Sequence, residues 1–186
     1  MRRVRRDEIV DFVTYGETRA AERTRVLALK EPRRIHVGAH LTFLFENADT
    51  VRYQIQEMMR AEQMVKEADI RHELDTYNEL LGGTGELGCT LLIEIETAKE
   101  RDEKLRAWRT LPQHLYARLA DGTRVRPTFD ARQLDDERLS SVQYLKLDTH
   151  GQVTIALGAD HPALTVEALL TAAQREALDA DLRSDA

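Results

Sequence analysis

The spacing of apolar residues predicts two consecutive amphipathic helices, over residues 48–66 and 67–81. The second helix shows the clearer pattern, because its apolar residues fall at positions i, i+4, i+7 and i+11 of one stripe: Ile70, Leu74, Tyr77 and Leu81. The apolar stripe of the first helix consists of Val51, Ile55, Met58 and Met59. Asn47 is a favourable N-cap for the first helix, and Gly82-Gly83 ends the second. We therefore expect a helix pair that buries one face of each helix.

A third helix is expected nearer the N-terminus. Thr14-Tyr15-Gly16-Glu17 has the spacing of a capping box, and Pro32 would stop a helix that runs to about Lys30. Before this helix, Asp7 would cap a short helical turn over residues 8–13.

Shorter apolar runs predict strands on both sides of the helix pair. Residues 34–37 and 41–45 are expected to be extended, and the second run is apolar on both faces, as is typical of a strand in the middle of a sheet. Residues 90–96 alternate in character, with Leu91 and Ile93 on one face together with Ile95, which indicates a half-buried strand.

Two hairpins are predicted in the second half of the chain. Asp121-Gly122 separates residues 114–119 from 124–129, and His150-Gly151 separates residues 142–149 from 152–157. Pro127 favours an edge position for its strand. The remaining elements expected here are a charged helix from Thr97 to about Arg109, a strand over residues 163–169 and a final helix from Thr171 to about Leu182.

This order of elements predicts an α+β fold with a mainly antiparallel sheet and the helix pair packed on one face of it. The 186 residues suit a single domain over residues 1–186, in which residues 1–6 form a basic N-terminal tail. The tail contains Arg2, Arg3, Arg5 and Arg6 and is expected to be solvated.

The composition narrows the class of protein. The formal net charge of −6 gives no general attraction to nucleic acid or to an anionic membrane, so neither is an expected partner. The N-terminal arginines are not followed by an apolar run of signal-peptide or membrane-spanning length, so we expect a cytoplasmic protein. The single cysteine, Cys89, excludes an iron–sulfur cluster held by this chain and is interpreted as a buried packing residue.

One candidate ligand-binding site combines the end of a strand with a face of the first helix. Arg52, Gln56 and Arg60 lie at i, i+4 and i+8 on this helix, about one turn from Glu46. Two guanidinium groups placed in this way can hold a carboxylate or a phosphate. The alternative interpretation is an internal salt bridge between Glu46 and Arg52 that ties the strand to the helix.

A second candidate is the pair Asp160 and His161, because an aspartate can orient an imidazole for acid–base chemistry. The alternative is a loop over residues 158–162 in which Asp160 forms an Asx-type turn. A single metal ion held by His40, Glu46 and His161 is a further hypothesis. A ferritin-like di-iron site is excluded, since the chain has only one imperfect copy of the required Glu-x-x-His pattern.

Three stretches of the chain are distinctive: FLFENADTVRYQIQEMMR, ELDTYNELL and IALGADHPAL. They resemble a family of bacterial proteins known as domain of unknown function 3501, and the resemblance extends from about Arg6 to Leu182. It implies a stand-alone domain encoded near rubrerythrin-like and iron–sulfur proteins, which would then be its partners. On this basis we expect an accessory or binding protein in a redox or oxidative-stress setting. The alternative is a metal-dependent or small-anion-binding enzyme with a pocket near Glu46, Arg52 and His161.

Overall fold

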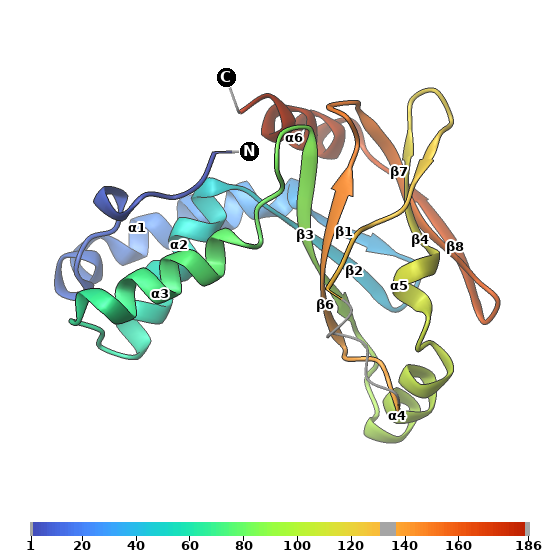
Figure 1. Cartoon of the computed structure of the whole chain (residues 1–186), viewed down its shortest axis with the longest axis horizontal. Helices are drawn as coiled ribbons and strands as arrows, with labels where there is room; N and C mark the ends of the chain where they lie inside the picture. Colours follow the sequence, from blue (N-terminus) through green and yellow to red (C-terminus); the bar gives the residue numbers. More distant parts are fainter. Residues whose placement is uncertain (1, 131–136, 185–186) are drawn as a thin grey trace.

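The computed structural model describes residues 2–130 and 137–184 and contains two four-stranded sheets beside a group of helices (Figure 1). The first sheet has the order β1 (Arg34–Val37), β2 (Leu41–Glu46), β3 (Glu86–Ile93) and β6 (Val142–Asp148). The second has the order β5 (Arg124–Val125), β4 (Leu115–Leu119), β7 (Thr154–His161) and β8 (Leu164–Leu169). All neighbouring strands are antiparallel, which confirms the predicted α+β class, although the strands form two sheets where one was expected.

The inner faces of the two sheets share one hydrophobic core. Leu91 and Leu145 contribute to it from the first sheet, and Leu115 and Leu157 contribute from the second. Because side chains alternate along a strand, the same alternation that predicted a half-buried strand at residues 90–96 places Leu91 inside. Helix α6 (Ala172–Arg183) contacts both β3 and β7 and covers one end of the two sheets (Figure 1).

The predicted helix pair is present as part of a three-helix group. Helix α2 (Ala48–Ala61) packs on α1 (Phe12–Lys30) and on α3 (Glu67–Asn78), and Figure 1 shows this group projecting to one side of the sheets. The predicted apolar stripes supply the buried apolar residues, which are Val51, Ile55 and Met59 on α2 and Ile70 and Leu74 on α3. Because α2 packs on both α1 and α3, the three helices form a group of their own beside the sheets.

Three helix boundaries differ from those expected, and one of them is the end of α3, which lies at Asn78 and not at Leu81. Helix α1 begins at Phe12, because Asp11 accepts hydrogen bonds from the backbone N–H groups of Val13 and Thr14, so the box predicted at Thr14 lies inside the helix. Helix α2 ends at Ala61, and Gln63 follows with a φ of 50° that is incompatible with a continuing helix. Short helices occupy three further segments: the 3-10 turns η1 (Arg6–Glu8) and η2 (Glu31–Arg33), and α5 (Leu111–His114). Helix α4 (Ala98–Ala107) is capped by Thr97 as predicted.

The N-terminal segment was expected to be a solvated tail, but Val4 and Arg6 attach it to α3. Val4 is buried, and its backbone N–H and C=O groups bond to the Oδ1 and Nδ2 atoms of Asn78, at 2.9 Å each. Arg6 forms an ion pair with Glu67. Val4 lies in the hydrophobic core, between the exposed side chains of Arg3 and Arg5. None of the helices in the described ranges has the length and apolar character needed to cross a membrane.

Candidate functional site

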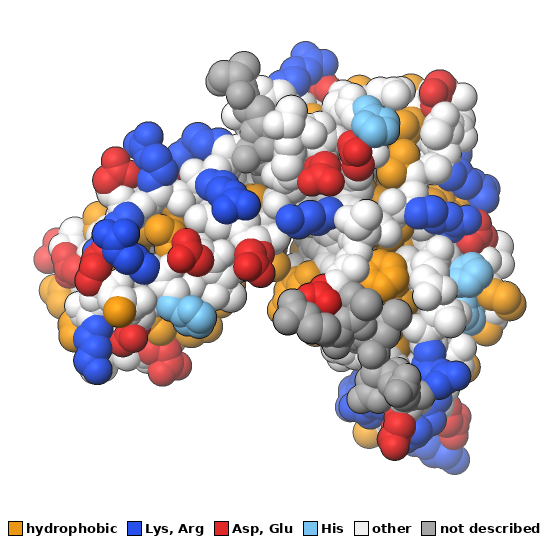
Figure 2. All heavy atoms as spheres, viewed as in Figure 1, with side chains coloured by type: hydrophobic (Ala, Val, Ile, Leu, Met, Phe, Trp, Pro, Cys, Tyr) orange, Lys and Arg blue, Asp and Glu red, His pale blue; other side chains and the backbone are white. Residues whose placement is uncertain are grey.

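A cleft of about 720 Å³ separates the helical group from the edge of the first sheet. Figure 2 shows the molecular surface hollowed between these two parts. Its walls come from α3 with the turn after it, from the edge strand β6 and from the segment 128–130. The lining residues are Glu73, Thr76, Tyr77, Glu79, Leu80, Cys89, Thr128, Phe129, Asp130, Tyr144, Leu145 and Lys146.

The helical wall of the cleft follows from helix geometry. Glu73 and Tyr77 lie one turn apart, so both side chains lie on the same face of α3. The next residue along from each, Leu74 and Asn78, is buried on the inner side of the helix. The face of α3 that borders the cleft therefore lies next to the buried apolar face of the helix. Tyr77 lies on this face and is partly buried against the core.

The wall of the cleft opposite α3 is formed by β6 and by the segment 128–130, which pairs with it. Tyr144 and Lys146 alternate along β6 with residues buried towards the other sheet. Lys146 forms an isolated bridge with Thr128: the Thr128 N–H donates to the Lys146 carbonyl at 2.8 Å, and the Lys146 N–H donates to the Thr128 carbonyl at 2.9 Å. This bridge holds Phe129 and Asp130 at the rim of the cleft.

The side chains of the cleft are suited to recognition. Tyr77, Phe129 and Tyr144 supply aromatic surface, and the charged groups are mainly carboxylates. Cys89 is buried, and burial, together with the nearby Glu46 carboxylate, raises the pKa of its thiol. This thiol is therefore held in its unreactive protonated form, as the interpretation of Cys89 as a packing residue requires.

The structure does not form the predicted ion pair between Glu46 and Arg52. The carboxylate of Glu46 accepts a hydrogen bond from Thr50 Oγ1, and burial raises its pKa, against the opposing effects of the Lys30 charge and the Thr50 hydroxyl. Arg52 pairs instead with Asp49 at 3.3 Å and with Glu22 at 3.7 Å. The pair does not form because the Glu46 carboxylate is hydrogen-bonded to Thr50, in the first turn of α2. The Arg52 guanidinium group has two other carboxylates within reach, those of Asp49 and Glu22.

Gln56 and Arg60, the other two residues of this candidate ligand-binding site, differ in burial. Gln56 is buried and clamps the backbone of Val10: its Oε1 accepts from the Val10 N–H at 2.8 Å, and its Nε2 donates to the Val10 carbonyl at 3.1 Å. Arg60 is exposed at the end of α2. Arg52 and Gln56 do line one small cavity of about 160 Å³, together with Tyr15 and Tyr53. Anion binding at this face remains a prediction.

Asp160 and His161 lie in β7, where a loop was expected, because this segment pairs with β8. Adjacent residues of a strand point to opposite faces. Asp160 is therefore outside, held by Arg126 at 2.9 and 2.6 Å, which replaces the expected Asx turn and lowers the pKa of the carboxyl. His161 is inside and buried. His114 links the two, with its Nδ1 3.4 Å from Asp160 Oδ1 and its ring edge-on to His161 at 5.1 Å.

The hydrogen bonds of His161 fix its role. The backbone N–H of Ala163 donates to its Nδ1 at 3.1 Å, so the neutral ring carries its proton on Nε2 and donates to Thr110 Oγ1 at 3.2 Å. Burial and the charge of His114 lower the pKa of His161. In this arrangement His161 is a neutral donor to Thr110 and does not act as a base towards its hydroxyl group.

The predicted metal ligands His40, Glu46 and His161 are not brought together. Strand β2 lies between His40 and Glu46, and His161 belongs to the second sheet. Both ring nitrogens of His40 are engaged, since Lys104 Nζ lies 2.6 Å from Nε2 and the Glu94 carbonyl lies 3.3 Å from Nδ1. Throughout residues 2–130 and 137–184, the structure contains no group of three His, Cys, Asp or Glu side chains arranged to hold a metal ion.

Sequence reasoning missed the cleft, because its walls come from three separate segments. Tyr77 was recognised as part of a helical stripe, but no local pattern links it to Phe129 or Lys146. The only available signal was Tyr144, an aromatic residue at an outward position of a predicted strand.

The chain resembles a solved protein over almost its whole length. A crystal structure described as that of a novel protein of unknown function from Burkholderia pseudomallei K96243 matches it with a TM-score of 0.87 and 29% sequence identity, covering 97% of this chain and 100% of that chain. Among curated proteins, none matches the chain. A family model described as "Protein of unknown function (DUF3501)" matches residues 3–182, which confirms the resemblance seen in the sequence: the chain belongs to the DUF3501 family.

Proposed function

We propose that the protein is a binding protein whose ligand occupies the cleft between α3 and β6. The cleft volume of about 720 Å³ carries this proposal, since it falls within the range of about 300–1,000 Å³ typical of pockets for small organic molecules. Apolar and aromatic side chains with a few polar groups at the rim are also typical of such pockets.

Binding fits the lining better than catalysis does. The thiol of Cys89 is buried and protonated, and His161, the residue expected to do acid–base chemistry, is a neutral hydrogen-bond donor that does not line the cleft. In the part of the chain that the structure describes, the lining offers aromatic rings, carboxylates and the ammonium group of Lys146, which orient a ligand by contact and charge. A role as an accessory protein to redox partners of the rubrerythrin or iron–sulfur type remains a prediction from the family resemblance.

Fluorescence titration with a neutral N-alkyl dansyl amide tests the proposal, because the emission of this probe rises when it enters an apolar site. The wild-type protein should bind one probe per chain. Thr76→Trp places a bulky side chain at an exposed position that lines the cleft, and should abolish binding without unfolding the protein. Asp75→Trp is the matched control, since Asp75 is the exposed neighbour on α3 and does not line the cleft.

The proposal fails if the wild-type protein shows no saturable binding. It also fails if both tryptophan variants bind the probe as well as the wild type does. Circular dichroism and thermal melting of the two variants establish that both remain folded.

A further inference from the structure

We infer that the cleft selects ligands that carry an amine or guanidinium group on an aromatic or aliphatic body. This inference rests on the proposed function, because it names the ligand class of the same site. It depends on the charges of the two walls and on the aromatic rings beside them.

The helical wall of the cleft is acidic. Glu73 is half-buried in the lining, and Glu79 lies at its edge, at the C-cap of α3. Within the part of the chain that the structure describes, neither carboxylate forms an ion pair, whereas Glu67 at the start of the same helix is paired with both Arg6 and Arg71. Two carboxylates facing a cleft without cationic partners create a negative potential there, which favours a cationic ligand.

The aromatic residues strengthen this preference for a cation. Tyr77 lies one helical turn from Glu73, so a cation bound by the carboxylate also lies near the ring. The same chain already places a guanidinium group between a ring and an acid: Arg124 lies 4.2 Å from the centre of the Tyr116 ring and 3.4 Å from Asp160. The described lining of the cleft offers a cation the same two kinds of contact partner, an aromatic ring and a carboxylate.

Lys146 sets the direction in which a ligand would lie. Its ammonium group is on the strand wall, opposite α3, and repels a cation from that side. The cationic group of the ligand would therefore be held at Glu73 and Glu79, with the apolar body against Phe129 and Leu80. Among the described lining residues, the carboxylates of Glu73 and Glu79 therefore face the one ammonium group of Lys146.

Three dansyl probes of matched length test the inference, ending in an alkyl group, an ammonium group (dansylcadaverine) or a carboxylate. In low salt the wild-type protein should bind the ammonium probe about tenfold more tightly than the neutral one, and the carboxylate probe most weakly. The preference should shrink at high salt, because exposed charges are screened.

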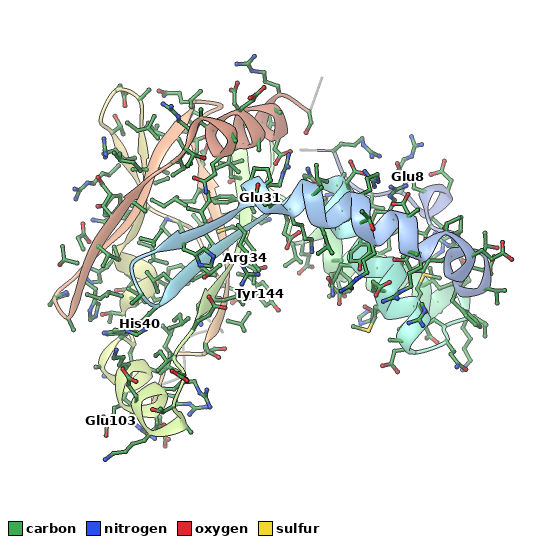
Figure 3. The ribbon with its side chains drawn as sticks, turned by 180° about the vertical axis from the view of Figure 1, so that it is seen from behind. Glu8, Glu31, Arg34, His40, Glu103 and Tyr144 are labelled. Carbon is green, nitrogen blue, oxygen red and sulfur yellow. The ribbon has the colours of Figure 1, made fainter. Side chains whose placement is uncertain are left out.

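Charge-neutralising variants locate the effect. Glu73→Gln and Glu79→Gln should each weaken binding of the ammonium probe by about threefold and leave binding of the neutral probe unchanged. Glu103→Gln removes the same charge from an exposed position on α4, remote from the helical group in Figure 3, and should change neither. Lys146→Met should tighten binding of the ammonium probe.

The outcomes separate this inference from the proposed function. If the neutral probe binds in the cleft but the ammonium probe binds no better, the charge selection is wrong and the binding function stands. If the ammonium probe is favoured but Glu103→Gln weakens it as much as Glu73→Gln does, the preference reflects net charge and the inference is overturned. If no probe binds, both fail.

Discussion

Arg33 and Asp181 form a bidentate ion pair between η2 and α6, although 148 residues separate them in the sequence. The two bonds measure 2.7 and 2.8 Å, and only 7% and 6% of the two side chains are exposed. Asn47, the N-cap of α2, donates a further hydrogen bond to Asp181 at 3.0 Å. One buried carboxylate therefore connects the last helix, the turn η2 that follows α1, and the start of α2.

Replacing Asp181 with alanine should destabilise the protein by about 3–5 kcal/mol, because it leaves a buried guanidinium group without a counter-charge. Chemical denaturation measures this loss. The matched control is Asp179→Ala, which removes an i, i+4 pair with Arg183 on the same helix and should cost less than about 1 kcal/mol. Equal losses in the two variants would contradict the importance of the buried pair. The double variant Arg33→Met/Asp181→Leu should recover much of the stability, since it removes both charges.

The sequence predicted those features of the fold that depend on neighbouring residues. The stripe of Ile70 and Leu74 identified α3, and the caps Asn47, Thr97 and Thr171 mark the starts of three helices in the structure. These signals are local, because a cap bonds to a backbone group two or three residues away and a stripe repeats with every turn.

The sequence did not predict which distant groups meet. Glu46 and Arg52 were paired because they are close in the sequence, but Glu22 of α1 competes for the arginine from 30 residues away. The division of the strands into two sheets depends in the same way on long-range pairing of β4 with β7. The cleft was missed for this reason too, since its position depends on how α3 stands against β6.

Glu46→Gln should stabilise the protein at neutral and alkaline pH. Burial raises the pKa of this carboxyl in the folded state above its ordinary value of 4.5, so the unfolded state gives up the proton more readily. The stability of the wild-type protein relative to the variant should therefore fall as the pH rises from 4.5 through the folded-state pKa, and then level off. The glutamine can still accept the hydrogen bond from Thr50. Melting temperatures of both proteins across this pH range provide the check, and a constant difference would refute the prediction.

His161 should titrate below 6.5, its ordinary value, because it is buried and faces the charge of His114. A histidine with a lowered pKa stays neutral in the folded state while it protonates in the unfolded state, so stability is lost as the pH falls through 6.5 and on to the folded-state pKa. NMR titration of the imidazole C–H resonances measures the pKa directly. His114→Ala removes the repelling charge and lets water closer, so it should raise the pKa of His161. A pKa of His161 at or above 6.5 in the wild-type protein would disprove this account.

Gly158 should not tolerate a methyl group, because the Tyr116 ring crosses β7 directly above it. A Cβ atom at this position would lie 2.5 Å from both Cζ and the hydroxyl oxygen of Tyr116, and 2.7 Å from the Val166 carbonyl oxygen. Gly158→Ala should therefore cost about 1–3 kcal/mol by overpacking, and should displace the Tyr116 hydroxyl group from its 3.0 Å bond to Glu167.

The matched control for this substitution is Gly16→Ala in α1, where the added Cβ meets nothing within 4 Å. It should stabilise the protein by about 0.5–1 kcal/mol, since alanine loses less backbone entropy than glycine on entering a helix. Urea denaturation of the two variants measures both effects. The opposite signs distinguish a steric requirement at Gly158 from a general response of the fold to losing a glycine. If Gly158→Ala were as stable as the wild type, the Tyr116 ring would have to move freely, and the Arg124 side chain stacked on it would not be held in place.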